Sequence, residues 1–215
     1  MKTIKNKSFI ILSTFVCLLP ILMYVFVFDQ LPEQMVQHWG AGGTPTWTMP
    51  REFAIFVLPL VLALIHLIVV FAIGVSAAKG EISAKFHAII LWFIPVTSIF
   101  VNLIVIFGNL NENFDVGTAA LAFVGLTFIV MGNYLPQTRP NWYAGIRTYW
   151  TMNNADVWYR THRLGGKLFI FAGILLLLGA ALPLSESIFT GLFLLAIVLA
   201  VVVPIVYSYV LYKRL

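Results

Sequence analysis

Six long runs that contain no Lys, Arg, Asp or Glu constrain this chain more than any other feature of its sequence. A bilayer core of about 30 Å needs roughly 20 apolar residues in a helix, and each run meets or approaches that length. None has the alternating pattern of a membrane β-barrel strand. The runs are Ser8–Phe28, Phe53–Ala78, Phe86–Asn111, Val116–Thr138, Leu168–Ser185 and Ser187–Tyr212. The sequence therefore predicts an all-α fold, a polytopic bundle of six transmembrane helices in the cell membrane.

The first run, Ser8–Phe28, follows three lysines and so shares one feature with a signal peptide. It is longer than the apolar core of a signal peptide, which has about 7–15 residues, and no small-x-small cleavage site follows it. We therefore expect this run to remain in the protein as the first helix.

The overall composition disfavours the soluble alternatives. Of the 215 residues, 61% are hydrophobic and 10% are charged, whereas a soluble domain is about 45–50% apolar and about 25% charged. So few charged residues cannot form the polar surface that a soluble enzyme or a nucleic-acid-binding domain needs. We therefore expect no direct contact with nucleic acid, although the net charge is +5. The single cysteine, Cys17, excludes an intrachain disulfide.

The placement of the basic residues predicts the orientation, because Lys and Arg gather in cytoplasmic loops. With the N-terminus in the cytoplasm, twelve of the thirteen Lys and Arg residues lie inside and only Arg51 lies outside. The inner segments then carry twelve basic and two acidic residues, a net charge of +10. The outer segments carry one basic and six acidic residues, a net charge of −5. Both termini are thus predicted to be cytoplasmic, and the inner segments are expected to attract anionic lipid headgroups.

Two long loops carry most of the polar chemistry, and long loops are where binding residues concentrate. The outer loop, residues 29–52, belongs to an N-terminal half of three helices, residues 1–115. The inner loop, residues 136–167, belongs to a C-terminal half of three helices, residues 116–215. The candidate residues of the outer loop are Glu33, His38, Trp39 and Trp47.

A short helix is expected to lie along the membrane surface before the fifth span. Asn153 or Asn154 suits the N-cap of a helix over Ala155–Leu164, and the pair Gly165-Gly166 suits its end. Aromatic and apolar residues fall on one side of this segment and arginines on another, which is typical of an interfacial helix. It serves either as an anchor that sets the height of the fifth span or as a docking surface for a cytoplasmic or lipid partner.

Two arginines of the inner loop, Arg139 and Arg147, lie in a stretch bounded by Pro and Gly. Guanidinium groups there are suited to binding phosphate headgroups bidentately, and the simpler interpretation is the general excess of positive charge inside. His162 follows Trp158 by four residues and so shares a helical face with it. A proton-linked role and a purely hydrogen-bonding role are both open for this histidine.

Two polar residues fall inside the spans, His66 in the second run and Asn102 in the third. Such residues often mark a pathway through a membrane protein, and the simpler alternative is a hydrogen bond between them or to backbone. In the outer loop, His38 and Glu33 are two ligands without a third, so no metal site is predicted. The sequence contains no catalytic or cofactor-binding motif, so no catalytic residue and no cofactor is predicted, and an enzyme is the less favoured class.

The two long loops resemble each other. The segment LPEQMVQHWGAGGTPTWT begins at Leu31 and LPQTRPNWYAGIRTYWT begins at Leu135, and with one gap they share seven residues in seventeen aligned pairs. Each loop follows the first helix of its half, and the two halves have opposite predicted orientations. A 3+3 inverted repeat, as in many transporters, is one interpretation; chance similarity between two segments rich in Gly and Trp is the other.

The inner loop also carries a family signature. The segment GNYLPQTRPNWYAGIRTYWTMNNADVWYRTHRLGGKLF, from Gly132 to Phe169, resembles the signature of the SdpI family of bacterial membrane proteins. The family pattern is roughly G-N-Y-x-P-x-x-x-P-N-x-x-x-G-I-R-T-x-W-T, followed by V-W-x-x-T-H-R-x-G-G. The N-terminal half, with L-P-x-x-x-x-x-H-W-x-x-x-G-x-P-x-W, resembles a module of unknown function that often precedes this signature. The resemblance gives as a binding or signalling motif Asn133, Tyr134, Pro136, Arg139, Pro140, Asn141, Gly145, Arg147, Thr148, Trp150, Thr151, Trp158, His162 and Arg163.

The resemblance implies a multi-pass immunity protein of a Gram-positive bacterium. The best-known member of the family protects its producer from a secreted killing peptide, the sporulation-delaying toxin, and holds a cytoplasmic repressor at the membrane. The expected partners are therefore a secreted peptide toxin at the outer loop and a cytoplasmic repressor at the inner loop. Two other functions stay open: a small transporter or flippase-like protein, suggested by the repeat and His66, and a membrane-embedded enzyme acting on lipid or peptide through His38 or His162 and the arginines.

Overall fold

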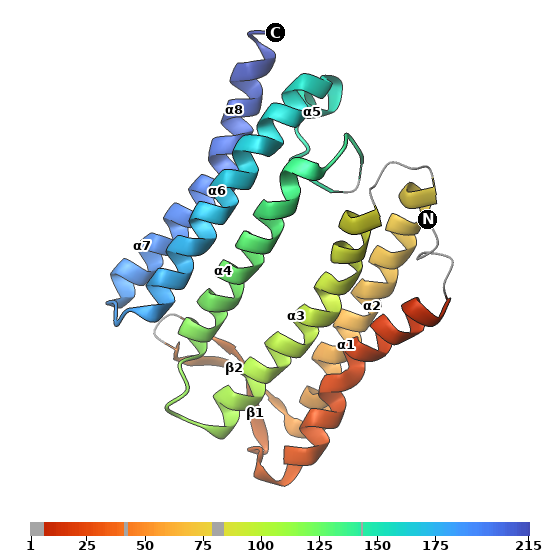
Figure 1. The fold of residues 1–215 in the computed structure, drawn as a ribbon. Helices are drawn as coiled ribbons and strands as arrows, with labels where there is room; N and C mark the ends of the chain where they lie inside the picture. The colour runs from red at the N-terminus through yellow and green to blue at the C-terminus, as the bar shows by residue number, and fades with distance from the viewer. Residues whose placement is uncertain (1–6, 41–42, 79–83, 143) are drawn as a thin grey trace. The chain divides into compact units, whose positions relative to one another are not determined.

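The computed structural model describes residues 7–40, 43–78, 84–142 and 144–215, and Figure 1 shows its elements. Within them, six helices are long and apolar enough to cross a membrane. They are Ser8–Gln30, Arg51–Ile73, Ala88–Leu110, Val116–Gln137, Ala155–Ala181 and Ser187–Arg214. The six predicted long apolar helices are therefore confirmed, and the helix of the fifth span begins at Ala155, ahead of the predicted Leu168.

The chain divides into two compact units, which we describe separately. Unit 1 comprises Met1–Ala77 and His87–Ala120, and unit 2 comprises Ala78–Phe86 and Leu121–Leu215. The long helices of unit 1 are α1 (Lys7–Val27), α2 (Arg51–Ala78) and α3 (Ala84–Leu110), and a 3₁₀ turn, η1 (Phe28–Gln30), follows α1. Its buried apolar core consists of Tyr24, Leu31, Met35, Ala54, Ile55, Val105 and Ile106. This core joins all three helices to the segment between α1 and α2.

The segment between α1 and α2 is a β-hairpin, which corrects the all-α prediction. Its strands β1 (Gln34–Trp39) and β2 (Pro45–Pro50) pair in antiparallel fashion. Asn109 of α3 holds the free edge of β1, because its Oδ1 accepts a hydrogen bond from Val36 N at 2.8 Å and its Nδ2 donates one to Val36 O at 2.9 Å. The side-chain amide thus takes the place of a neighbouring strand and fixes the hairpin to unit 1.

In unit 2, α4 (Val116–Tyr134) packs closely against α6 (Ala155–Ala181). A Cβ atom on Gly125 would lie 2.9 Å from Gly173 O, and one on Gly132 would lie 2.7 Å from Gly166 O. The two backbones therefore touch where glycines face each other, as helices in membranes often do. The buried apolar core of unit 2 consists of Leu121, Ala172, Leu176, Ala196 and Ala200.

The last span is a helix with one widened turn. It consists of α7 (Glu186–Ile197), a π-helical segment η4 (Val198–Val202) and α8 (Val203–Tyr212). Pro204 lacks an N–H, and a proline ring clashes with the carbonyl group four residues before it. The hydrogen-bond ladder shifts here, and Val203 N donates to Val198 O five residues back.

The prediction of a separate interfacial helix over Ala155–Leu164 is wrong. The helix α6 continues through Gly165-Gly166 to Ala181. The two glycines allow close packing inside the helix, since a Cβ on Gly165 would lie 2.5 Å from Ile146 Cδ1. The predicted cap is confirmed, since the Asn154 side chain accepts hydrogen bonds from the first turn of α6. A separate short helix, α5 (Tyr149–Asn153), precedes α6.

Candidate functional site

The family-like motif forms an ordered loop against the first turns of α6. After the 3₁₀ turn η3 (Leu135–Gln137), Asn141 closes the loop on itself. Its Oδ1 accepts a hydrogen bond from Ala144 N at 2.8 Å, and its Nδ2 donates to Arg139 O at 2.7 Å and to Ala144 O at 3.1 Å. Asn141 is buried, so it shapes the loop from within and is not offered to a partner.

Trp158 is the side chain around which this loop packs. It is fully buried, and its Nε1 donates a hydrogen bond to Thr138 O at 3.0 Å. Its ring stacks on that of His162, with the ring centroids 4.0 Å apart. A buried indole needs such a partner for its N–H, and here the partner belongs to the start of the loop.

His162 joins the loop to α6 through both ring nitrogens. Nε2 accepts a hydrogen bond from Ile146 N at 3.0 Å, so the proton of a neutral ring sits on Nδ1, which lies 2.8 Å from Trp158 O. Both bonds require the neutral ring, since a protonated Nε2 has no lone pair for the backbone N–H. The side chain of His162 is fully buried, and both of its hydrogen bonds are made to backbone atoms of unit 2.

Gly145 is the point at which the loop comes closest to these rings. Its φ of 122° lies in the region that side chains rarely adopt. A Cβ atom here would collide with His162 Nε2 and would lie 3.1 Å from Trp158 Cη2. The glycine of the motif is therefore required by both its backbone angle and the space available.

Thr148 and Thr151 end the loop and begin α5. The Thr148 Oγ1 accepts a hydrogen bond from Thr151 N at 3.2 Å, and Thr148 N donates to Thr151 Oγ1 at 2.9 Å, which makes a reciprocal capping box. Thr148 Oγ1 also lies 3.1 Å from Ser208 Oγ of α8. Trp150 packs on Tyr209 with ring centroids 4.9 Å apart. The motif thus ties α5 to the last span.

The remaining motif residues face outward. The predicted division of α6 is confirmed, since Trp158 and Thr161 are buried while Arg160 and Arg163 are exposed. The Arg147 guanidinium donates a hydrogen bond from Nη1 to Trp142 O. The other exposed motif residues are Asn133, Arg139, Pro140 and Gly145, while Tyr134 and Pro136 are half-buried. The structure therefore separates the motif into a buried hydrogen-bonded set and an exposed basic set.

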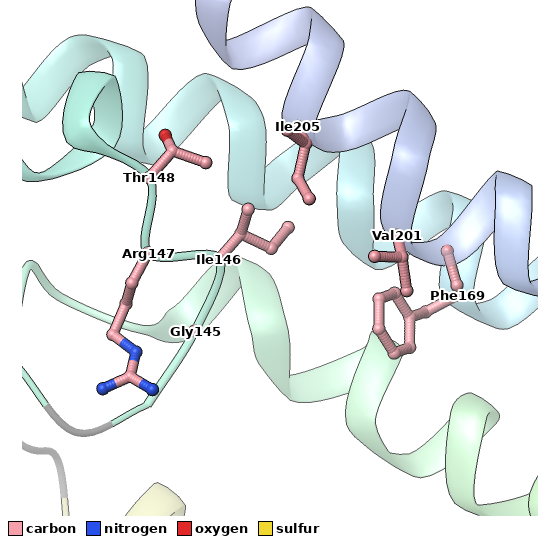
Figure 2. A pocket seen from close by; sticks show the side chains of 8 residues that line it. Gly145, Ile146, Arg147, Thr148, Phe169, Val201 and Ile205 are labelled. Atoms are coloured by element: carbon pink, nitrogen blue, oxygen red, sulfur yellow. The ribbon is translucent and has the colours of Figure 1, made fainter.

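An open hollow of about 300 Å³ lies beside this loop. Figure 2 shows Ile146, Phe169, Val201 and Ile205 around it, with Arg147 at the edge of the loop. Its remaining lining residues are Gly145, Thr148 and Ala200. The loop, α6, η4 and α8 all contribute to this one hollow.

The candidate residues of the hairpin have separate roles. Thr46 Oγ1 donates to His38 O at 3.1 Å, and so it accepts from His38 Nδ1 at 2.6 Å. Trp39 packs against Gly108 of α3, whereas the Trp47 side chain is 53% exposed. The Glu33 carbonyl oxygen accepts a hydrogen bond from Arg51 N at 3.0 Å. Among the described residues, no group of three or more His, Cys, Asp or Glu side chains is placed to hold a metal ion.

The two polar residues inside the spans of unit 1 do not pair with each other. His66 Nε2 lies 2.9 Å from Ser13 Oγ, and Ser13 Oγ donates to Ile10 O. Asn102 accepts a hydrogen bond from the Tyr24 hydroxyl at 3.1 Å. The predicted pairing of these two residues is therefore wrong, because each hydrogen-bonds to a side chain of α1. Asn102 Nδ2 also donates to a backbone oxygen, Ser98 O, at 2.8 Å.

Two family models match the chain. Residues 137–208 match the SdpI/YfhL protein family, and residues 15–63 match a domain of unknown function, DUF1648. The chain thus contains an SdpI/YfhL region over residues 137–208. A similar curated protein, the "Immunity protein SdpI" of Bacillus subtilis (strain 168), is 25% identical over 95% of this chain and 96% of that protein. No solved structure matches the chain.

The SdpI/YfhL match, together with the six apolar helices, makes this chain a multi-pass protein of the cell membrane. The family region contains the loop, α6 and the last span up to Ser208. Thr138, Ile146 and Ser208 are partners of the motif that sequence reasoning missed. No local signal marks them, because two act through backbone atoms and Ser208 lies sixty residues from its partner.

Proposed function

We propose that this protein is an integral membrane immunity protein that gives its cell resistance to a secreted, membrane-active peptide toxin. The observation that carries the proposal is the match to "Immunity protein SdpI" along nearly the whole of both chains. That match includes the DUF1648 region as well as the SdpI/YfhL region. It therefore supports the same overall arrangement and not merely one shared motif.

The β-hairpin supports a peptide-binding role for unit 1. Every residue of β2 except Met49 is exposed, including Trp47. Proteins often recognise extended peptides through an exposed strand, and exposed tryptophans are frequent centres of binding energy. Arg51 is the one Lys or Arg of segment 29–52. It donates from Nη1 to Leu31 O at 3.0 Å and lies 4.5 Å from the Phe28 ring centroid. The hairpin is thus held firmly by its own unit while β2 is available to a secreted peptide.

The basic surface of unit 2 supports a second role in relaying the presence of the toxin. Arg139, Arg147, Arg160 and Arg163 are all exposed. These arginines belong to the loop and to α6. The buried side chains of Asn141, Trp158 and His162 fix the conformation of the loop against α6. A preorganised surface loses less conformational entropy when it binds a partner. We propose that a cytoplasmic repressor binds this surface.

The immunity proposal is tested by expressing the protein in cells that are sensitive to the sporulation-delaying toxin. Cells with the wild-type protein should survive toxin concentrations that kill cells with an empty vector. Trp47→Ala should lose at least about tenfold of this protection, because a tryptophan at the centre of an interface contributes about 2 kcal/mol or more. The measurement is the toxin concentration that halves survival.

Trp142→Ala is the matched control, because Trp142 is also exposed but belongs to unit 2. It should protect as well as the wild type. Membrane levels of all variants are compared by immunoblot. Death of cells that hold the wild-type protein in their membrane at normal levels would contradict immunity against this toxin.

A further inference from the structure

The hollow in unit 2 has an apolar side and a side formed by a loop that carries an arginine. Phe169, Val201 and Ile205 give it an apolar wall, and the loop residues Gly145 to Thr148 form its other side. In Figure 2 the Arg147 guanidinium points away from the apolar side chains. The site is therefore suited to an amphiphile, with a place for an apolar tail and a separate place for a charged head.

The position of the hollow along the spans fits the level of lipid headgroups. The helix α6 has 27 residues, which is about 40 Å of helix, whereas the hydrocarbon core is about 30 Å thick. The loop packs against the first turns of α6, where Gly145 meets Trp158 and Ile146 meets Gly165. The loop therefore covers the part of α6 that extends beyond the hydrocarbon core, and the apolar wall continues into the core.

The widened turn of the last span opens the apolar wall. Ala200 and Val201 of η4 both line the hollow, and Ala200 has only a methyl group to fill the space. Val201 and Ile205 remain 43% and 39% exposed. Widened turns of this kind are frequent at functional sites. Here the turn leaves a groove that is open toward the lipid.

The net positive charge of segment 136–167, which supplies Arg147 to the hollow, favours an anion. The exposed basic residues of segment 136–167 are Arg139, Arg147, Arg160, Arg163 and Lys167. The one acid of this segment is Asp156. By the positive-inside assignment this surface faces the inner leaflet, where anionic lipids attract basic residues.

We propose that the hollow binds an anionic phospholipid of the inner leaflet, with one acyl chain against Phe169, Val201 and Ile205 and the phosphate on Arg147. A guanidinium has five donors in a planar fork and binds phosphate bidentately. Arg147 uses Nη1 for Trp142 O, which orients the group and leaves the rest of the fork for phosphate. A volume of about 300 Å³ is at the lower end for ligand pockets and suits part of one acyl chain. This proposal does not rest on immunity, because it needs no toxin.

Native mass spectrometry of the purified full chain in detergent tests the site, with phosphatidylglycerol and phosphatidylcholine as probes. The wild type should retain phosphatidylglycerol in preference to phosphatidylcholine. Arg147→Gln should weaken phosphatidylglycerol binding about tenfold, because a charge-assisted hydrogen bond contributes about 1.5–3 kcal/mol. Val201→Trp should fill the groove and abolish retention of both lipids.

Matched controls separate this site from general charge attraction. Arg163→Gln removes an exposed arginine that does not line the hollow, and Val198→Trp changes an η4 valine that is also 43% exposed. Both should bind phosphatidylglycerol within about twofold of the wild type. Inorganic phosphate in large excess should not displace the lipid, because the acyl chain supplies part of the affinity.

Four results would overturn the proposal. Equal retention of phosphatidylglycerol and phosphatidylcholine by the wild type would show that the site does not select an anionic lipid. Equal losses of phosphatidylglycerol binding in Arg147→Gln and Arg163→Gln would show general charge attraction and no specific site. Displacement of the lipid by inorganic phosphate alone would show that the acyl chain contributes no affinity. Normal binding by a Val201→Trp protein with an unchanged unfolding temperature would exclude the hollow.

Discussion

Gly145 shows how a single residue of the motif shapes the folded loop. It has a positive φ and lies against both His162 and Trp158. His162 and Trp158 are fully buried, and each makes a hydrogen bond to the loop. Gly145, Trp158 and His162 of the signature therefore depend on one another, and their contacts give the loop one conformation.

Gly145→Ala should lower the free energy of unfolding by about 2–6 kcal/mol. The backbone strain of a non-glycine residue at this φ costs about 1–3 kcal/mol, and the overpacking against His162 and Trp158 costs about 1–3 kcal/mol more. The change is measured by denaturant unfolding in detergent micelles. Gly43→Ala is the control, because Gly43 has a φ of 73° but nothing within 4 Å of its Cβ position. It should cost only about 1–2 kcal/mol, and equal losses in both variants would show that the collision contributes nothing.

Helix α6 shows why glycines are hard to interpret at the scale of an element. Gly165-Gly166 looks like a helix end, since glycine favours termination. In the structure the pair lies inside α6, where Gly166 lets the α4 backbone approach at Gly132. A glycine inside a helix costs about 1 kcal/mol in propensity, and the close packing of two helices offsets this cost.

Gly166→Ala should destabilise the protein by up to about 2 kcal/mol, although alanine is the better helix former. The overpacking against Gly132 O and Pro136 costs about 1–3 kcal/mol, which exceeds a propensity gain of about 1 kcal/mol. Gly191→Ala on α7 should have the opposite sign, because nothing lies within 4 Å of its Cβ position. Unfolding midpoints of the two variants are compared with the wild type. Stabilisation by both substitutions would refute close packing of α4 on α6.

At the scale of the whole molecule, the distribution of charge predicts which loops face which side. Twelve of thirteen basic residues fall on the predicted inner side. The hairpin is then outside and segment 136–167 is inside, as the immunity and lipid proposals both require. The 3+3 inverted repeat stays a prediction at this scale.

Cysteine labelling in intact cells checks this orientation. In a Cys17→Ala background, a membrane-impermeant maleimide should label Thr48→Cys in intact cells, because Thr48 is exposed on β2. Asn153→Cys, which replaces an exposed residue of α5, should be labelled only after the cells are permeabilised. The reverse pattern would invert the topology. Labelling of both sites in intact cells would contradict the separation of the two loops by the membrane.

The sequence by itself determined the six spans and the amphipathic start of α6, because both follow from properties of neighbouring residues. A span needs only length and the absence of charge, and a helical face needs only the spacing of residues. Only the tertiary structure decided that the segment after α1 is a β-hairpin, that α6 continues through Gly165-Gly166, and that His162 accepts a hydrogen bond from Ile146 N. These outcomes depend on partners distant in the chain, such as Asn109 for Val36 and Gly132 for Gly166. Local propensity cannot specify them, because the deciding free energy comes from packing and hydrogen bonds that exist only after the chain has folded.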